Sequence, residues 1–364
     1  MRVAILVDAL VNKGGVERIV LQQAKLFNAD LYVGRFSENT FEEFKNFNII
    51  KITKTYNVYS RLHTLYLWYK FSKLNLQGKY DLFIIHGASA LNSARKNNPN
   101  LWYCHSPSRY LYDLHQEEYK KLQFPKNLLF KFITNIQRRI DQKNVSFIDK
   151  IVVNSNNVKE RVKKFYNRES EILYPFVETK KFKFISQENF YLSTARLDKI
   201  KRVDLIIKAF LKMPDKKLII ASDGPEKKNL IKLCKNSKNI TFLGYVSEEK
   251  LRELYGKCIA TLYLSYKEDF GIIPIESMAA GKPCIATNDG GFKETIIHKK
   301  TGFLVDQPEN TENVIKAINY MTKKRCLEMR KDCEKQAKKF DINVFNKKHF
   351  EIVNNLLNTL KNNF

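Results

Sequence analysis

Short apolar runs alternate with amphipathic stretches along almost the whole chain. The run 2–8 (RVAILVD) is followed by a stretch from about Gly15 to Phe27, whose apolar positions recur at helical spacing. More runs of strand length follow, and helical stretches separate most of them: 30–36, 47–53, 81–87, 101–106 and 150–155. Such alternation predicts an α/β fold, in which parallel sheets are covered by helices.

A second series of alternating elements begins at 190–197. It continues with further apolar runs at 217–224, 239–244, 258–265, 283–287 and 302–306. Pro175 and the basic residues within 173–184 interrupt the pattern between the two series. Because 364 residues exceed the size at which a single core stops growing, we expect two Rossmann-like domains that face each other across a cleft.

The domain boundary is placed after residue 176, so that 1–176 and 177–364 form the two predicted domains. The last helical stretch, about 344–364, either closes the second domain or crosses back to the first, and the sequence leaves both arrangements open. No internal repeat or low-complexity segment stands out in either domain.

The charge of the chain is strongly positive. It has 64 Lys and Arg against 38 Asp and Glu, which gives a formal net charge of +26. Such a charge suits nucleic acids, anionic membranes and phosphorylated ligands alike, and does not choose among them. The sequence has no zinc-finger spacing, RNP-like aromatic motif or basic-zipper pattern, so we expect no nucleic-acid partner.

The six cysteines and the apolar runs bear on the compartment. No two cysteines form a CxxC pair and most fall in apolar strands or helices, which indicates buried reduced thiols and a cytoplasmic protein. No apolar stretch approaches the roughly 18 to 20 residues of a membrane-spanning helix. The first run resembles a signal peptide only briefly, because Asp8 interrupts it and no small-residue cleavage site follows. We therefore expect neither secretion nor a transmembrane anchor.

Two glutamates flank an apolar loop within 266–283 (YKEDFGIIPIESMAAGKP). Its first proline suits the first position of a helix, so a helix is predicted over 274–280, with Glu276 in its first turn. The preceding run 258–265 predicts a buried parallel strand, which places Glu268 just beyond its carboxyl end. Ligands bind at that edge of open α/β sheets, and helix N-termini attract anions there.

Further polar features follow strands of the second series and are expected at the same edge of its sheet. They are Arg196 with Lys201, the turn Asp223-Gly224-Pro225, and the glycines of 288–294 (NDGGFKE). Arginine and lysine can neutralise a diphosphate, the first through its fork and the second as a mobile point charge. Because these cations and the helix start serve phosphate, the glutamates are suited to accept hydrogen bonds from ribose and sugar hydroxyls.

In this order the motifs resemble those of the family-4 retaining glycosyltransferases, whose two Rossmann-like domains form the GT-B fold. The family pattern is R-L-x3-K, then D-G-P, then E-x7-E with Phe-Gly in the loop. It is matched by Arg196, Lys201, Asp223, Gly224, Pro225, Glu268, Phe270, Gly271 and Glu276. Asp269 departs from the pattern, because many members have glycine there, and it would narrow the sugar pocket.

The resemblance implies a role for the matched residues. Glu268 would hold hydroxyls of the transferred sugar and Glu276 would bind the ribose, while Arg196 and Lys201 would stabilise the departing nucleotide diphosphate. The remaining matched residues, with Asp269, would line the donor site. The family needs no metal for this step, so we expect no metal and no cofactor, with a sugar nucleotide as the donor substrate.

The first half carries two further features of the family. The stretch NKGGVERIV resembles its glycine-rich loop after the first strand and maps onto Gly14, Gly15 and Glu17, where the glycines would let the backbone approach the donor phosphate. His105, in WYCHSPSRYLYD, matches a histidine that the family places at a strand end beside the sugar, and would join the catalytic residues. Taken alone, a plain strand-helix turn and a structural histidine would also explain these residues. The surrounding HSPSRY…D most resembles mannosyltransferases of bacterial O-antigen and related glycan assembly, which use GDP-mannose.

Two stretches of the first half, 56–76 and 119–143, are amphipathic helices by spacing and rich in basic and aromatic residues. Against Asp141, the second stretch has the basic residues Lys120, Lys121, Lys126, Lys131, Arg138, Arg139 and Lys143. It interleaves them with Phe124, Leu128, Phe130, Phe132 and Ile136. Solvated charges over a packed core explain many such patterns; the alternative is docking at an anionic membrane surface.

These expectations combine into one hypothesis. The chain would be a cytoplasmic hexosyltransferase, peripheral at the inner face of the membrane, that moves mannose from GDP-mannose to a hydroxyl of a growing lipid-linked glycan with retention of configuration. Three alternatives stay open: a UDP-sugar-dependent transferase, a sugar-nucleotide epimerase, and a catalytically inactive basic protein that binds glycan or nucleic acid. The sequence identifies neither the acceptor nor the linkage formed.

Overall fold

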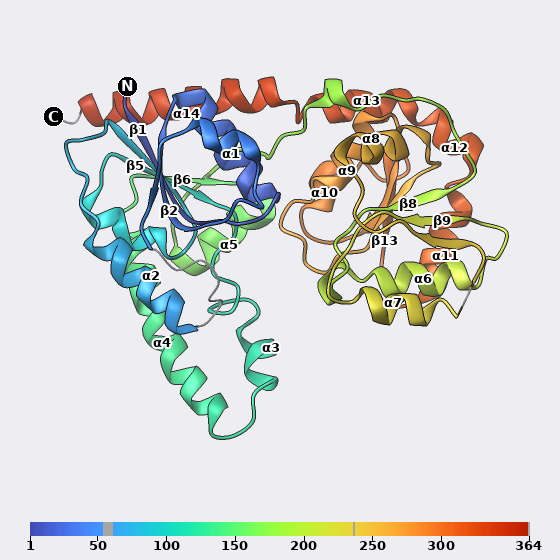
Figure 1. Ribbon diagram of the computed structural model, residues 1–364, viewed down its shortest axis with the longest axis horizontal. Helices are drawn as coiled ribbons and strands as arrows, with labels where there is room; N and C mark the ends of the chain where they lie inside the picture. The colour runs from blue at the N-terminus through green and yellow to red at the C-terminus, as the bar shows by residue number, and fades with distance from the viewer. Residues whose placement is uncertain (54–60, 236, 363–364) are drawn as a thin grey trace. The chain divides into compact units, whose positions relative to one another are not determined.

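The computed structural model describes residues 1–53, 61–235 and 237–362. The chain divides into two compact units. Unit 1 comprises Met1–Tyr174 together with Asn346–Phe364, and unit 2 comprises Pro175–Phe345. The last helix, α14 (Ile342–Asn362), therefore ends as part of unit 1, which is one of the two arrangements that the sequence left open (Figure 1).

Unit 1 is a parallel sheet with helices between most of its strands. Its strands are β1 (Val3–Leu10), β2 (Asp30–Phe36), β3 (Ile49–Lys51), β4 (Leu82–His86), β5 (Asn100–Cys104), β6 (Lys150–Val153) and β7 (Glu171–Ile172). Its helices before α14 are α1 (Gly15–Phe27), α2 (Arg61–Lys73), α3 (His115–Lys120), α4 (Lys126–Val145) and α5 (Asn156–Tyr166).

Unit 2 repeats this plan with shorter strands. They are β8 (Tyr191–Ser193), β9 (Leu218–Ile220), β10 (Ile240–Phe242), β11 (Thr261–Tyr263), β12 (Cys284–Thr287) and β13 (Gly302–Val305). The helices are α6 (Val203–Leu211), α7 (Lys227–Leu233), α8 (Glu248–Lys257), α9 (Ile273–Ala279), α10 (Phe292–Thr295), α11 (Thr311–Tyr320), α12 (Lys323–Glu328) and α13 (Arg330–Lys338).

Both sheets have a doubly wound order. Unit 1 has the order β3-β2-β1-β4-β5-β6-β7 and unit 2 the order β10-β9-β8-β11-β12-β13, and all the pairs are parallel. The direction of winding reverses between β1 and β4 and between β8 and β11. In open α/β sheets, ligands bind beyond the carboxyl ends of the strands at such a switch point. The predicted fold class, two α/β domains with parallel sheets, is confirmed.

Apolar burial explains why these runs form strands. Leu6 of β1, Ile85 of β4 and Val153 of β6 are completely buried and pack in one cluster with Phe71 of α2. In unit 2, Leu192 of β8 packs with residues of α8 and of the loop after α9. Burying a large aliphatic or aromatic side chain contributes about 1.5 to 3 kcal/mol, so these clusters stabilise the two sheets.

The helix bounds follow local signals in most places. Helix α1 has the predicted bounds and ends at Asn28, whose φ of 46° lies in the left-handed region. Helix α9 starts one residue before the predicted helix, with Pro274 in its first turn. Part of the predicted helix 56–76 lies outside the described residues; the described part contains α2.

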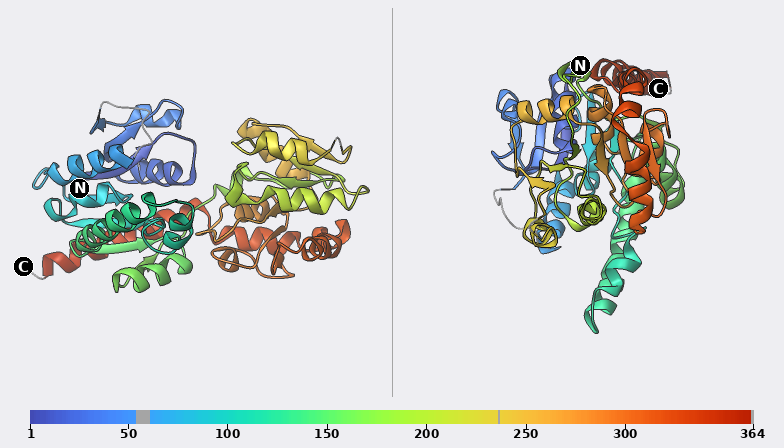
Figure 2. Two further views of the ribbon diagram at one scale, coloured as in Figure 1. Left: turned by 90° about the horizontal axis from the view of Figure 1, so that it is seen from below. Right: turned by 90° about the vertical axis from the view of Figure 1, so that its right-hand side faces the viewer.

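The stretch 119–143 differs from its prediction as one amphipathic helix. It contains the end of α3, a connection with Pro125, and most of α4. In Figures 1 and 2, α3 and α4 form an arm that extends away from the sheet of unit 1. Phe130, expected among the interleaved apolar residues, is instead buried and stacks on His115, with 5.2 Å between the ring centroids.

Candidate functional site

The switch point of unit 2 brings together a lysine and a glutamate that the sequence singled out. Lys201 ends a short 3-10 turn (Lys199–Lys201) after β8, and Glu268 lies in the loop after β11. The Lys201 Nζ donates to Glu268 Oε2 at 2.7 Å, and both side chains are about one-fifth exposed. The neighbouring strands β8 and β11 therefore hold this pair at the edge where a ligand of the fold binds.

Tyr263, the last residue of β11, supports both members of this pair. Its hydroxyl donates to Glu268 Oε2 at 3.3 Å, and the Lys201 Nζ lies 5.2 Å from the centre of its ring. Burial, together with the Glu268 carboxylate, raises the pKa of Tyr263 well above its ordinary value. The phenol therefore stays protonated and acts as a donor to the carboxylate.

Glu276 has a different environment from Glu268. It lies in the first turn of α9, as predicted, and is 8% exposed. Its Oε2 accepts from the Tyr255 hydroxyl at 3.0 Å, and that hydroxyl lies 2.9 Å from Thr194 Oγ1, just beyond β8. Burial, followed by Glu276, raises the pKa of Tyr255 well above its ordinary value, so Tyr255 is a permanent donor.

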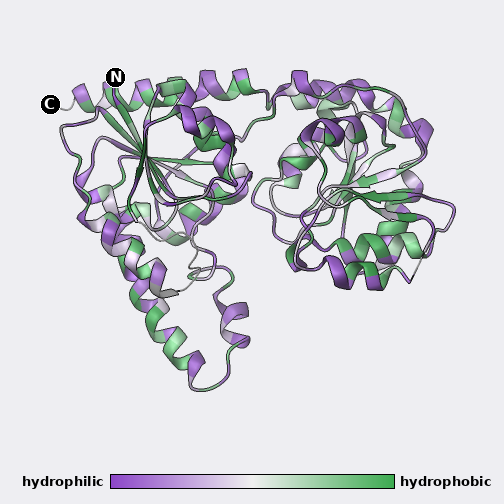
Figure 3. Cartoon of the chain, viewed as in Figure 1, coloured by the Kyte–Doolittle hydropathy of each residue, from purple (hydrophilic) through white to green (hydrophobic). Residues whose placement is uncertain are grey.

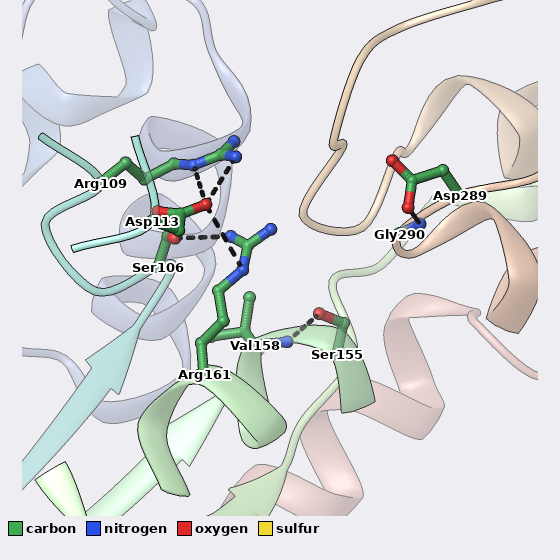
Figure 4. A network of polar contacts seen from close by, with 8 residues as sticks. All are labelled: Ser106, Arg109, Asp113, Ser155, Val158, Arg161, Asp289 and Gly290. Atoms are coloured by element: carbon green, nitrogen blue, oxygen red, sulfur yellow. Dashed lines mark hydrogen bonds and ion pairs between the residues drawn. The ribbon is translucent and has the colours of Figure 1, made fainter. Parts of the chain in front are cut away.

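Glycines hold the loop that carries Glu268. Gly290 has a φ of 56°, and a Cβ there would lie 2.1 Å from the Glu268 backbone oxygen. The same oxygen accepts from the Gly291 N–H at 3.0 Å. Figure 4 includes the local bond from the Gly290 N–H to Asp289 Oδ1, at 2.8 Å. A side chain at Gly290 would therefore displace the loop that positions Glu268.

The next residues of this loop are placed by packing. Gly271 has a φ of 84°, which favours glycine. Phe270 is 2% exposed and its ring meets that of Phe340 edge-on, with 5.8 Å between centroids. Asp269 is half-buried. The donor-binding roles of these three residues stay predictions.

Arg196 and the Asp-Gly-Pro turn lie in the loops after β8 and β9. Arg196 is exposed, and its guanidinium makes no hydrogen bond or ion pair within 1–53, 61–235 and 237–362. Gly224 is required for close approach, since a Cβ would lie 2.4 Å from the Leu197 backbone oxygen. The Lys227 Nζ donates to Asp223 Oδ2 at 2.6 Å and lowers the pKa of Asp223. Asp223 is therefore ionised, and the turn packs against the loop that contains Arg196.

His105 in unit 1 belongs to a buried chain of polar side chains. Its Nε2 lies 2.9 Å from His86 Nδ1, and His86 Nε2 lies 2.6 Å from Gln23 Oε1 of α1. Burial lowers the pKa of His105 to about 4 and that of His86 well below its ordinary value. Both rings are therefore neutral near pH 7.

Two carboxylates of unit 1 accept hydrogen bonds from backbone N–H groups, one in the glycine-rich loop and one at the switch point. Glu17 Oε1 accepts from the N–H groups of Val11 and Asn12, at 3.4 and 3.3 Å. At the switch point itself, Asp8 accepts from the N–H groups of Ser89 and Ala90, at 3.0 and 2.6 Å. Gly14 is the N-terminal cap of α1 and Gly15 is its first residue. Their predicted approach to a donor phosphate remains a prediction.

Several residues of these sites escaped the sequence analysis. Tyr263 was read only as part of the apolar run 258–265, although a tyrosine at the carboxyl end of a buried strand is a signal of a polar partner, and Tyr255 was not considered. Thr194, His86 and Gln23 had no motif to mark them. Within the described residues, no group of three or more His, Cys, Asp and Glu side chains is arranged to hold a metal ion.

Two family descriptions match the chain, one for each unit. Residues 177–340 match the glycosyl transferases group 1, and residues 13–181 match glycosyltransferase family 4. The chain belongs to the family-4 glycosyltransferases. This finding confirms the resemblance that the motifs around Lys201 and Glu268 indicated.

Individual curated relatives match parts of this chain at modest sequence identity. An N-acetyl-alpha-D-glucosaminyl L-malate synthase of Bacillus anthracis is 31% identical over 173 residues, which are 43% of this chain and 45% of that protein. An alpha-1,3/1,6-mannosyltransferase ALG2 of Mus musculus is 27% identical over 267 residues, covering 63% of this chain and 62% of that protein. The chain thus spans less than two thirds of the length of these two curated relatives.

The GT-B architecture is also found among solved structures. The crystal structure of Anabaena Alr3699/HepE in complex with UDP and glucose has a TM-score of 0.74 at 17% sequence identity. The match covers 96% of this chain and 99% of that one. At this identity the likeness concerns the fold alone.

Proposed function

We propose that the chain is a retaining glycosyltransferase that moves a mannosyl group from GDP-mannose to a hydroxyl of a lipid-linked glycan. The observation that carries the proposal is the Lys201–Glu268 pair at the switch point of unit 2, with 2.7 Å between Nζ and Oε2. A cation for the leaving diphosphate and a carboxylate for sugar hydroxyls lie side by side there. Preorganised charges of this kind supply a large share of the rate enhancement in many enzymes.

The residues divide the work of transfer between them. Lys201 and Arg196 neutralise the charge that grows on the leaving diphosphate, while Glu268 accepts from hydroxyls of the transferred sugar. Glu276, held by Tyr255 at 3.0 Å, accepts from the ribose. In a front-side attack, the acceptor oxygen bonds to the anomeric carbon as the bond to the phosphate oxygen breaks. The leaving phosphate then takes the acceptor's proton.

Mannose is favoured by the HSPSRY motif and by the name of the murine relative, an alpha-1,3/1,6-mannosyltransferase. A UDP-sugar donor is the second candidate, favoured by a relative named for an N-acetylglucosaminyl product and by a structural neighbour described with UDP and glucose. An inactive protein is disfavoured, because Lys201 and Glu268 are both present and in contact.

Thermal unfolding with a panel of GDP-, UDP- and ADP-sugars tests the donor. A ligand at about a hundredfold its dissociation constant stabilises the fold by about 2.7 kcal/mol. GDP-mannose should raise the midpoint of unfolding most. A larger shift with a UDP-sugar would contradict the mannose assignment and favour the second candidate, while no shift with any of these donors would count against transfer altogether.

We further propose that the acceptor is reached at a membrane surface, through the arm of α3 and α4. The arm exposes large apolar side chains: Phe124 (78%), Leu128, Leu129, Phe132 (64%), Ile136 and Ile140. Lys126 and Lys131 are exposed beside them, and Figure 3 shows hydrophobic stretches along α4. No helix in the described part of the chain is long and apolar enough to cross a bilayer. Apolar insertion and basic contacts with headgroups would together let a cytoplasmic protein bind reversibly to the inner face of the membrane.

A further inference from the structure

Arg202, the residue after Lys201, joins three loops at the ligand-binding edge of unit 2. It follows the short 3-10 turn after β8, and its Nη2 lies 2.6 Å from Glu309 Oε1, in the loop after β13. Its guanidinium carbon lies 6.0 Å from the centre of the Tyr266 ring, in the loop after β11. The Arg202 side chain is 13% exposed. One largely buried side chain therefore reaches the loops of three strands.

Two of these loops carry the Lys201–Glu268 pair. The Tyr266 N–H donates to the Ile200 backbone oxygen at 3.0 Å, so a backbone bond joins the two loops just before Lys201. Arg202, on the other side of Lys201 in the chain, lies against the ring of the same tyrosine. Glu268 follows Tyr266 by two residues. The contacts with Tyr266 thus lie on either side of the point at which Lys201 meets Glu268.

The backbone at Arg202 has a conformation that arginine ordinarily avoids. Its φ of 53° lies in the left-handed region, where glycine is preferred at the end of a helical turn. Arg202 is also the N-terminal cap of α6, where the helix dipole disfavours a positive charge. Lys267, the residue after Tyr266, has a positive φ as well, at 47°. Non-glycine residues in such conformations cluster at functional sites, where the surrounding contacts hold them.

The ion pair between Arg202 and Glu309 does not by itself explain the arginine. Glu309 is 62% exposed, and an ion pair with one partner largely in water contributes little to stability. The pair instead fixes the direction of the guanidinium, which lies against the Tyr266 ring. Arg202 therefore occupies a position that local structure disfavours, and its contacts act on the loop that carries Glu268.

We infer that Arg202 is a positioning residue for the transfer step. It holds the loop of Tyr266, and with it the Glu268 carboxylate, at the right distance from the leaving diphosphate and the sugar. A displacement of about 1 Å at a reacting centre can lower a rate by about 10²-fold, so even a small shift of this loop would matter. The inference rests on the proposed function for the transfer step, whereas the effect of Arg202 on the Lys201–Glu268 pair does not.

Arg202→Gly separates positioning from stability. Glycine adopts the left-handed conformation without strain, so the midpoint of thermal unfolding should be unchanged or raised. The kcat of donor hydrolysis should nevertheless fall about tenfold while the KM for the donor changes less than about threefold, because the misplaced charges act mainly in the transition state.

Glu309→Gln tests the same contact from its exposed partner. This change should also lower kcat, by about threefold or more, because the guanidinium loses the charge that directs it. Arg202→Gly/Glu309→Gln should be no slower than Arg202→Gly alone, since both changes remove one interaction. The control is Lys212→Gln, which breaks an exposed ion pair with Glu312, at 2.8 Å, between the end of α6 and α11. It should leave both kcat and the unfolding midpoint unchanged.

Two results would overturn the positioning role. One is an unchanged kcat in Arg202→Gly, or a fall of equal size in Lys212→Gln. The other is a fall in kcat that comes with a lower unfolding midpoint in both Arg202→Gly and Glu309→Gln, which would make Arg202 a structural brace.

A second measurement does not depend on activity. Urea unfolding of Lys201→Met, Glu268→Gln and the double variant gives the coupling between these two residues, both with Arg202 and in the Arg202→Gly background. Without Arg202 this coupling should fall to about half or less. An unchanged coupling would overturn the inference. If the wild type hydrolyses none of the sugar nucleotides while the coupling still falls, the proposed function fails and the action of Arg202 on the pair stands.

Discussion

The Lys201 ammonium and the Glu268 carboxylate are 2.7 Å apart, although 67 residues separate them in the chain. The sheet order of unit 2 brings them together, because β8 and β11 are neighbours at the switch point. Tyr263 gives Glu268 a second donor at 3.3 Å. A diphosphate and a sugar would compete for groups that already satisfy each other, so each residue should matter for both stability and turnover.

Replacement of either charge should therefore change both the stability of the fold and the rate of turnover. Lys201→Met should destabilise unit 2, because it removes the Lys201 cation from a partly buried Glu268 carboxylate. The free energy lost should lie between that of an exposed and that of a fully buried ion pair, so about 1 to 3 kcal/mol is expected. Glu268→Gln should lower turnover by about 10²-fold or more while the protein stays folded. Urea unfolding and donor hydrolysis measure the two effects.

The control for this pair is Lys208→Met, which breaks an exposed ion pair of α6 with Asp204 at 2.8 Å. It should change stability by less than about 0.5 kcal/mol. The double variant Lys201→Met/Glu268→Gln should recover part of the lost stability, since no unpaired charge remains. Additive losses in the double variant would mean that the two charges are not coupled.

Tyr263→Phe isolates the second donor to Glu268. The ring that lies beside Lys201 is retained and only the hydroxyl is lost, so the fold should persist. Turnover should fall by about tenfold or less, because the bond is long at 3.3 Å and one hydrogen bond to a charged group contributes about 1.5 to 3 kcal/mol at best. Steady-state donor hydrolysis measures the change. An unchanged rate would show that the Tyr263 hydroxyl does not help to position the carboxylate.

Acid should destabilise the protein through the buried histidines of unit 1. The pKa of His105 is lowered to about 4, from 6.5, so between these values the unfolded chain binds a proton that the folded chain excludes. Stability is thus fully present above about pH 6.5 and falls as the pH drops toward about 4. His105→Gln should flatten this dependence of the unfolding midpoint, although His86 will retain part of it. A steeper dependence in the variant would contradict the neutral-ring account.

The arm of unit 1 should bind anionic vesicles at low salt and bind neutral vesicles poorly. Lys126→Glu with Lys131→Glu should weaken co-sedimentation by removing attraction to the headgroups, which contributes about 1 kcal/mol per cation. Leu129→Ser with Phe132→Ser should weaken it through lost insertion. Arg138, which we had expected among the headgroup contacts, does not belong in this set, because its Nε donates to the Leu111 backbone oxygen at 3.0 Å.

Matched controls for the arm lie in unit 2. Tyr245→Ser removes an aromatic side chain that is 80% exposed, and Lys324→Glu with Lys331→Glu reverses two exposed charges. Neither should change sedimentation with vesicles. An equal loss of co-sedimentation in the control variants would show that overall charge and hydrophobicity are responsible. Equal binding to anionic and neutral vesicles would contradict specific docking of the arm at an anionic membrane.

Local signals in the sequence were sufficient for much of the fold. The bounds of α1, the first-turn place of Glu276 and the succession of most strands along the chain all follow from spacing, proline and apolar runs. Such signals act within a few residues along the chain, and the structure preserves them because no distant contact opposes them. Strand β7, with two residues, was too short to give a pattern.

Contacts between distant segments could not be predicted. That Lys201 meets Glu268, that His86 meets His105, and that Arg161 meets Ser106 all depend on which strands become neighbours. Phe130 was misjudged for a related reason: periodicity marks an apolar face of a helix, but the burial of Phe130 depends on its stacking with His115 of α3. The sequence thus named the predicted donor-site residues through motifs, and the sheet order supplied their partners.

Release of nucleotide diphosphate from sugar nucleotides tests the central claim most directly. The purified protein is incubated with GDP-mannose and with UDP-glucose, and the nucleoside diphosphate produced is quantified for the wild type, Lys201→Met, Glu268→Gln and Lys208→Met. The account predicts release from GDP-mannose by the wild type and Lys208→Met, and a loss of about 10²-fold or more in the two site variants. Undiminished release in Lys201→Met and Glu268→Gln, or no release from either donor by the wild type, would contradict it.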